Sequence, residues 1–295
     1  MPWSTLLGPL PRSPHTEMST WFSELCESTT GYPTGEMAIY GGRLAATPGL
    51  AFLAGYQAAL RALLPSAPRS IGALCVSEQG SSKVTDMQTR LINGYISGHK
   101  DFVIGGHAAQ WLIVLARDEA DQHAPHLTAA WLATDSTGVT LQAGPTLALL
   151  PDIPHCSVDF SQAQCKVLAG DGWNDYSKAF RTLEDAHVLA ALCAWLYGQS
   201  LLDQWPQGLQ LKLLAVLAGL KAILQQPHTE AATHLLLAGL LAQFTDLHTP
   251  ITQALNTHSC QTTAQAWQRD KAILEIARSA RMRRLEVAQN ALGLI

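Results

Sequence analysis

Charge is scarce in this chain. Asp, Glu, Lys and Arg together make up 14% of its 295 residues, where an ordinary soluble protein has about 25%. Hydrophobic residues make up 47%, which excludes a disordered chain, because disorder requires low hydrophobicity and high charge. A chain with so few charges must bury much of its surface or cover part of it with a partner.

An excess of basic residues is also absent. The 19 Lys and Arg residues are outnumbered by 23 Asp and Glu residues, which gives a net charge of −4. Proteins that bind nucleic acid neutralise its phosphates with a surplus of Lys and Arg. We therefore expect no nucleic-acid partner.

Long uncharged apolar runs are missing too. The most apolar stretch, Leu209–Leu224, carries Lys212 and Lys221 and ends at a Gln-Gln-Pro sequence. A membrane-spanning helix needs about 20 apolar residues with few charges, so this stretch predicts a buried bundle helix and no membrane span. The N-terminus has no basic segment before an apolar core, so we expect no signal peptide. Met18 is an alternative start to Met1.

No two cysteines have CxxC spacing. Without a secretion signal, the six cysteines are expected to be free thiols in a reducing cytoplasm. His123 and His126 are the closest histidine pair, and a lone HxxH in a loop is more typical of a solvated turn than of a metal centre. We predict no metal site.

The pattern along the chain changes twice. Residues 18–68 predict a short helix at Trp21–Ser28 and a longer one at Pro48–Leu64, with a turn-rich segment at 29–42. From Ile71 to Asp171, short apolar runs separated by turn residues predict an antiparallel sandwich or barrel. The expected strands are GALCV, GYISG, DFVIG, WLIVLAR, LTAAWLAT and CKVLAG.

From Tyr176 onward the pattern is helical, and proline-bearing connections predict an up-down four-helix bundle. Thr182 is expected to cap the first helix, with Glu184 and Asp185 in its first turn. A further short helix is possible near Ile251–Asn256. The expected bundle helices are Thr182–Leu202, Leu209–Leu224, Glu230–Leu247 and Ala264–Leu292.

Four segments resemble the acyl-CoA dehydrogenase family. Cys75–Thr89 (CVSEQGSSKVTDMQT) is similar to the family's CVTEPGAGSD signature, and Gly98–Arg117 to the segment that follows it. Val158–Arg181 resembles the strand that leads into the bundle, and Trp267–Ala280 the late Arg-Asp element. The resemblance implies an α+β multidomain fold with a reduced helical segment (1–70), a middle β-barrel (71–175) and a C-terminal four-helix bundle (176–295).

The family oxidises acyl-CoA thioesters to 2-enoyl-CoA. A carboxylate removes the α-proton, and the flavin N5 of FAD takes the β-hydride. Such a site needs a base within hydrogen-bond reach of a weakly acidic proton and a polarised thioester carbonyl. The flavin supplies the redox chemistry, and the protein positions it.

The resemblance places cofactor contacts at three positions and substrate contacts at two. Ser77 matches a threonine that hydrogen-bonds the flavin, and Phe102 matches an aromatic residue that packs beside it; an ordinary turn serine and a core aromatic are the alternatives. Ile104 stands where the family has a donor, and isoleucine has none, so FAD binding is possible but weakened or lost. Ser81 and Ser82 match the Gly-Ser end of the signature, near the acyl chain.

The bundle departs further from the family. The family's R-x-x-F-G element has no match, and its glycine-rich dinucleotide loop is replaced by Asn256–Ala266, which has no glycine to allow close backbone approach. The position of the catalytic Glu falls on Arg278, which cannot act as a base. Glu184 and Asp185 are the substitutes we nominate. Without the glycine that follows the family's Glu, the last helix is expected to run on uninterrupted.

Arginines cluster on that last helix, at Arg278, Arg281, Arg283 and Arg284. A solvated helix face and a site for a phosphate or an acidic partner are both open.

Two functions remain in view. The first is a divergent subunit in flavin-dependent oxidation of acyl thioesters, with a displaced base or as the half of a mixed oligomer that lacks the base. The alternative is a non-catalytic scaffold or binding protein that has kept the fold. Charge-poor helices predict a homo- or hetero-oligomer with another acyl-CoA dehydrogenase-like subunit, and acyl-CoA as a possible ligand.

Overall fold

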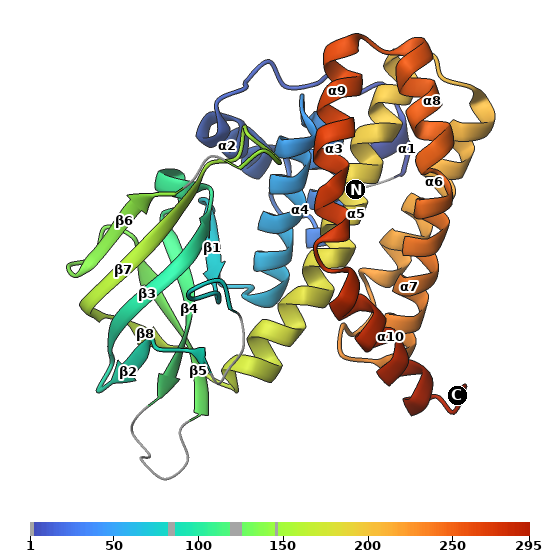
Figure 1. Ribbon diagram of the computed structural model, residues 1–295. Helices are drawn as coiled ribbons and strands as arrows, with labels where there is room; N and C mark the ends of the chain where they lie inside the picture. Colours follow the sequence, from blue (N-terminus) through green and yellow to red (C-terminus); the bar gives the residue numbers. More distant parts are fainter. Residues whose placement is uncertain (1–2, 82–85, 119–125, 145–146) are drawn as a thin grey trace. The chain divides into compact units, whose positions relative to one another are not determined.

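A computed structural model describes residues 3–81, 86–118, 126–144 and 147–295 of the chain (Figure 1). The chain forms two compact units. The helical unit comprises Met1–Ala62, Ala148–Leu150 and Thr182–Ile295, and the sheet unit comprises Leu63–Leu147 and Pro151–Arg181.

Four helices open the helical unit: α1 (Trp3–Leu7), α2 (Met18–Ser28), α3 (Thr34–Leu44) and α4 (Pro48–Leu63). The helices expected at Trp21–Ser28 and Pro48–Leu64 are confirmed. The expectation of turns at 29–42 is wrong, because α3 covers much of that segment. Its glycines serve packing: a Cβ on Gly41 would lie 2.6 Å from the Ala54 Cβ, and one on Gly42 would lie 2.0 Å from the Ala191 carbonyl oxygen. Only glycine permits such close helix contacts.

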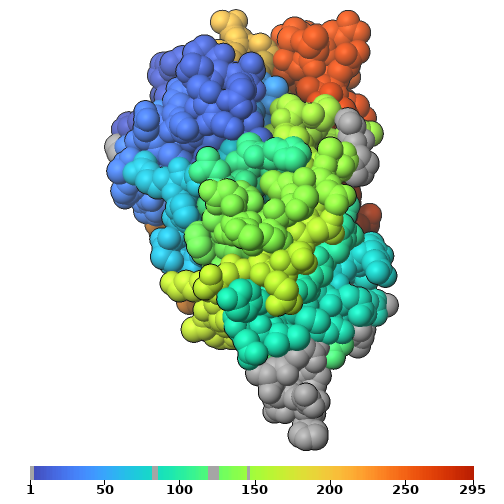
Figure 2. Space-filling model, turned by 90° about the vertical axis from the view of Figure 1, so that its left-hand side faces the viewer, coloured from blue at the N-terminus to red at the C-terminus, as the bar shows by residue number. Residues whose placement is uncertain are grey.

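The sheet unit holds one eight-stranded sheet in the order β6-β7-β3-β2-β4-β5-β8, with β1 also paired to β4. In the space-filling view, the teal residues of β3 and the yellow-green residues of β7 adjoin, although about sixty positions separate them (Figure 2). The strands are β1 (Gly72–Cys75), β2 (Arg90–Ile92), β3 (Tyr95–Ile104), β4 (Trp111–Asp118), β5 (His126–Ala133), β6 (Val139–Ala143), β7 (His155–Gln164) and β8 (Lys166–Val167).

Each expected strand lies in this sheet, but the expected set lacks β2 and β6. Two further features differ from the sequence-based picture. The GYISG and DFVIG runs form one strand, β3, interrupted by register shifts. The pairing is mixed, because β1 and β2 both run parallel to β4. The parallel pairing of β1 is supported by Trp111, whose indole packs on Gly72 and donates to the Ser70 carbonyl at 3.1 Å. The central strand β4 is buried along most of its length, as expected of a strand covered on both faces.

The C-terminal half supplies α5 (Ala179–Leu202), α6 (Gln207–Ile223), α7 (Ala231–Asp246) and α8 (His248–His258), so the first three bundle helices and the short helix near 251–256 are confirmed. Thr182 does not cap α5, because a π-helical segment (Gly172–Lys178) runs directly into the helix. Asp171 caps that segment by accepting a hydrogen bond from the Asn174 amide at 2.6 Å.

The expectation of one uninterrupted last helix is wrong. The chain forms α9 (Gln261–Asp270), a 3₁₀ turn (Lys271–Glu275) and α10 (Arg278–Ala291). The break persists without glycine because Arg281 donates to the Leu274 carbonyl exposed there. The buried Asp270 carboxylate at the end of α9 accepts from the Leu150 amide at 2.9 Å. Across the described ranges, every helix is too short or too polar to cross a bilayer.

Candidate functional site

A charged cluster joins α5 to α10 within the helical unit. Arg281 donates through Nε and Nη2 to Oδ1 of Asp185, at 2.8 and 2.6 Å, and Arg284 donates to Oδ2. Arg284 also donates to the Thr182 hydroxyl at 3.2 Å. Asp185 is buried and both of its oxygens are engaged, so it anchors two helices and is poorly placed to accept a proton from a substrate.

A small pocket lies beside this cluster. It has a volume of about 80 Å³ and is lined by Glu184, Asp185 and Arg281 together with apolar residues of α4, α5 and the α9–α10 break. The apolar lining residues are Phe52, Val188, Ile273, Leu274, Ile276 and Ala277. Glu184 and Asp185 therefore lie beside the break between α9 and α10, close to the position where the resemblance places the family's base. Neither residue lies in the first turn of α5, where the sequence had suggested they would be.

Arg278, at the position of the family's catalytic Glu, opens α10 but points to solvent. Its side chain is 76% exposed, and its nearest carboxylate is Glu275 at 3.9 Å. The four arginines of this helix thus divide into two kinds. Arg281 and Arg284 are held by Asp185, whereas Arg278 and Arg283 are exposed. The expected solvated face is correct only for the second pair.

In the sheet unit, the positions assigned to the flavin lie on β3 and on the loop after β1. Phe102 is 41% exposed, so it is not a core residue; it forms an edge contact with His155 at 6.4 Å between ring centroids. Ile104 pairs with His155 across the sheet. Ser77 and Ser81 lie in the loop after β1, and Ser82 lies outside the described residues.

The loop from Ser77 to Ser81 is fastened to β3 by Asp101. The Asp101 carboxylate accepts from the backbone amides of Gln79 and Gly80, at 3.0 and 2.8 Å, and the Asp101 amide donates to the Ser77 carbonyl at 2.9 Å. Adjacent amides in such a turn form a ready anion site, but here a carboxylate of the same chain uses them. The Ser81 hydroxyl donates to Asp86 at 2.7 Å.

A buried ion pair supports the same loop, and the sequence reasoning missed it. Lys100 is fully buried on β3 and donates to Glu78 at 2.6 Å and to the Val76 carbonyl at 3.1 Å. Burial acts to raise the pKa of Glu78, but hydrogen bonding and charge from Lys100 outweigh it and hold that pKa below its usual range. The sequence offered one signal for this pair: Lys100 lies between two expected strand runs, 22 positions from Glu78.

Of the three positions that the resemblance assigns to the flavin, Ser77 and Phe102 keep a suitable side chain, whereas Ile104 does not. Ile104 has no donor for the ring edge, and the amides at Gln79 and Gly80 already have an acceptor. The negative Asp101 carboxylate would also repel a phosphate placed at this turn.

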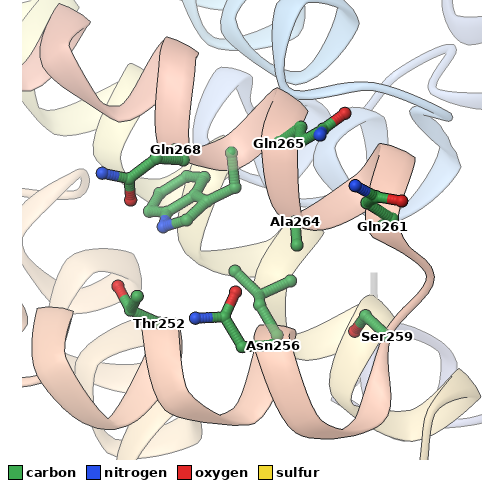
Figure 3. A pocket seen from close by; sticks show the side chains of 9 residues that line it. Thr252, Asn256, Ser259, Gln261, Ala264, Gln265 and Gln268 are labelled. Atoms are coloured by element: carbon green, nitrogen blue, oxygen red, sulfur yellow. The ribbon is translucent and has the colours of Figure 1, made fainter.

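The segment that replaces the family's glycine-rich loop forms the end of α8, a short turn and the start of α9. It borders a pocket of about 510 Å³ (Figure 3). Thr252 and Asn256 on α8 line it from one side, and Ala264, Gln265 and Gln268 on α9 line it from the other. The described lining carries no charge, so this pocket lacks a cation for a phosphate group.

No described group of side chains forms a metal centre. His123 lies outside the described residues, and the His126 imidazole lies 3.8 Å from the Asp118 carboxylate.

Comparison of the sequence with family models gives no match, and comparison with curated proteins also gives none. Solved structures do match. FkbI, for biosynthesis of the methoxymalonyl extender unit of the Fk520 polyketide, is 16% identical with a TM-score of 0.65, over 100% of this chain and 94% of that one. PigA with FAD and proline is 14% identical with a TM-score of 0.66, over 95% and 91% of the two chains.

Butyryl-CoA dehydrogenase from Megasphaera elsdenii is 15% identical with a TM-score of 0.60, over 88% of this chain and 80% of that one. Identities this low establish the shared fold and leave function to be argued from the site. The chain has the acyl-CoA dehydrogenase-like fold.

Proposed function

We propose that this chain is a divergent subunit in flavin-dependent oxidation of acyl thioesters, working beside a second acyl-CoA dehydrogenase-like subunit that holds the flavin. The occupied amides of the Gln79–Gly80 turn are the observation that carries this proposal. The Asp101 carboxylate fills the turn next to the expected cofactor contacts, which supports a weakened or lost flavin site in this chain.

The helical unit supports the same reading. The usual base position is Arg278, a permanent cation in solvent. Asp185 is engaged by two guanidinium groups, so proton removal falls to the companion subunit or to Glu184.

Exposed leucines on the charge-poor helices suit an oligomer. Leu211 on α6 is 58% exposed and Leu236 on α7 is 56% exposed, and such apolar surface is commonly covered by a partner.

We also propose a cytoplasmic location, because the six cysteines are all free thiols.

Co-purification tests the proposal. When the tagged chain is purified from its native host, a flavin-bearing acyl-CoA dehydrogenase-like subunit is expected to co-purify with it, and acyl-CoA oxidation is expected only from the pair. A tagged chain that is yellow and oxidises acyl-CoA alone would refute it.

Within an active pair, the Glu184→Gln variant locates the base. A loss of activity of about 100-fold or more assigns proton removal to this chain, and an unchanged rate assigns it to the companion subunit.

A non-catalytic binding protein is the second candidate, and the size of the α5–α10 pocket favours it. At about 80 Å³, the pocket is well below the roughly 300 Å³ from which small-molecule sites begin. Failure to co-purify with any dehydrogenase, together with the absence of acyl-CoA binding in calorimetry, would support this reading over the first.

A further inference from the structure

The far end of α5 carries a further pocket of the helical unit. It includes Gly198, thirteen residues beyond Asp185, which corresponds to about 20 Å along the helix. Its volume is about 520 Å³, within the usual range of small-molecule sites. Its apolar walls come from the segment after α1 and from the end of α5: Leu7, Pro9, Leu10, Pro11, Leu201 and Leu202.

Arg43 on α3 is the one charged side chain in the described lining of this pocket. It is 3% exposed, and burial lowers the pKa of its guanidinium. Its terminal nitrogens donate to the carbonyls of Leu6 and Gly8, and the group lies 5.2 Å from the centre of the Tyr197 ring. Among the described residues, no carboxylate forms an ion pair with it, so a buried positive charge is left without a counter-charge.

The Nε–H of Arg43 is buried and finds no acceptor in the described parts of the chain. It faces Gly198, because a Cβ built on that glycine would lie 3.0 Å from Nε and 3.4 Å from Cδ. Because Gly198 has no side chain, space remains beside the unpaired Nε–H donor of Arg43. Buried donors are normally paired, which points to an acceptor supplied from outside the chain.

A second arginine adds positive charge nearby. Burial, followed by repulsion from Arg43, lowers the pKa of Arg12 to about 10. Asp203 attracts Arg12 and offsets part of that charge, whereas no described carboxylate forms an ion pair with Arg43. The polar end of the pocket is therefore positive, and its remaining walls are hydrocarbon.

We propose that this pocket binds a medium-chain fatty acid, with the carboxylate against Arg43 and the hydrocarbon chain between the leucines and prolines. A guanidinium group suits a planar carboxylate in both charge and hydrogen-bond geometry. The described walls offer no other charged side chain, so the rest of the ligand must be apolar.

Calorimetric titration of the intact protein with decanoate tests the assignment. Saturable one-to-one binding is expected, and octanoate should bind about fifteenfold more weakly, because each buried methylene changes affinity by roughly fourfold. Decanol should bind at least tenfold more weakly than decanoate, because it has no charge to pair with Arg43.

Leu202 provides a variant that leaves Arg43 and the fold intact. It is 59% exposed at the pocket, and Leu294 near the C-terminus is a matched control at 57% exposure outside it. Leu202→Glu should weaken decanoate binding at least tenfold by repulsion, whereas Leu294→Glu should leave it unchanged. Absence of saturable binding, equal affinity for decanol, or equal effects of the two substitutions would overturn the proposal.

Discussion

Arg281 on α10 donates two hydrogen bonds to a single carboxylate oxygen of Asp185 on α5, although 96 positions separate the two residues. Through the same side chain, Arg281 also donates to the Leu274 carbonyl at the end of the 3₁₀ turn. One guanidinium group thus ties the first bundle helix to the last and supports the break between α9 and α10.

Replacing Asp185 with asparagine should destabilise the protein strongly. The change leaves the guanidinium groups of Arg281 and Arg284 without their common counter-charge, and breaking a buried pair costs about 3–5 kcal/mol. Urea unfolding measures the loss. Glu275→Gln is the control, because Glu275 is 56% exposed and lies 3.9 Å from Arg278, so its removal should cost less than about 1 kcal/mol. Equal losses would contradict the anchoring role of Asp185.

Replacing two glycines, Gly42 and Gly239, with alanine should change the stability of the protein in opposite directions. Gly42→Ala places a Cβ 2.0 Å from the Ala191 carbonyl oxygen, and forcing α3 away from α5 should cost about 2–3 kcal/mol or more. Gly239 lies inside α7, where a Cβ would meet nothing within 4 Å, so Gly239→Ala should stabilise the protein by up to about 1 kcal/mol. Thermal unfolding of both variants checks the signs, and a stable Gly42→Ala protein would refute the close helix contact.

His187 should make the protein sensitive to mild acid. Because the Leu183 carbonyl can only accept, Nδ1 carries the proton in its 2.7 Å contact, and Nε2 accepts from the Thr34 hydroxyl at 3.0 Å. Burial lowers the pKa of His187 from 6.5 to about 4. Between pH 6.5 and pH 4 only the unfolded chain takes up the proton. The free energy of unfolding therefore decreases as the pH is lowered through this range, by about 3 kcal/mol in total.

A variant without a titrating group isolates this effect. His187→Gln should lose less stability than the wild-type protein between pH 7 and pH 4 when urea unfolding is followed at each pH. Parallel pH dependence of the two proteins would show that His187 is already protonated in the folded state or is not buried.

Cys260 should be the reactive thiol. The hydroxyls of Thr262 and Thr263 lie 3.1 Å from its sulfur, and hydrogen bonding from Thr262, then Thr263, lowers the pKa of Cys260 from 9.0 to about 7. Burial instead raises the pKa of Cys75 to about 12. Iodoacetamide at neutral pH should therefore label Cys260 first, because the thiolate is the nucleophile. Cys260→Ser should abolish the fast phase in mass spectrometry, and an unchanged fast phase would contradict the prediction.

Much of the fold could be predicted from the sequence, because apolar periodicity and proline-bearing connections are local signals. They located α5, α6 and α7 to within a few residues. The prediction fails at α3 because paired glycines such as Gly41 and Gly42 are typical of turns, and the residues they pack against, Ala54 and Ala191, are distant in the sequence.

The site was harder to predict, since its side chains are arranged by tertiary contacts. The resemblance brought attention to Arg278, but the residues that organise this end of the bundle are Arg281, Arg284 and Asp185. Likewise, Ser77 and Phe102 were nominated from motif positions, whereas the loop geometry depends on Asp101 and on the Lys100–Glu78 pair.

Flavin titration of the purified chain tests the central claim most directly. The chain alone should be colourless, and added FAD should show the spectrum of free flavin, because the amides at Gln79 and Gly80 are used by Asp101 and Ile104 offers no donor. A yellow preparation with one tightly bound flavin per chain, reduced by acyl-CoA without a companion subunit, would contradict the account.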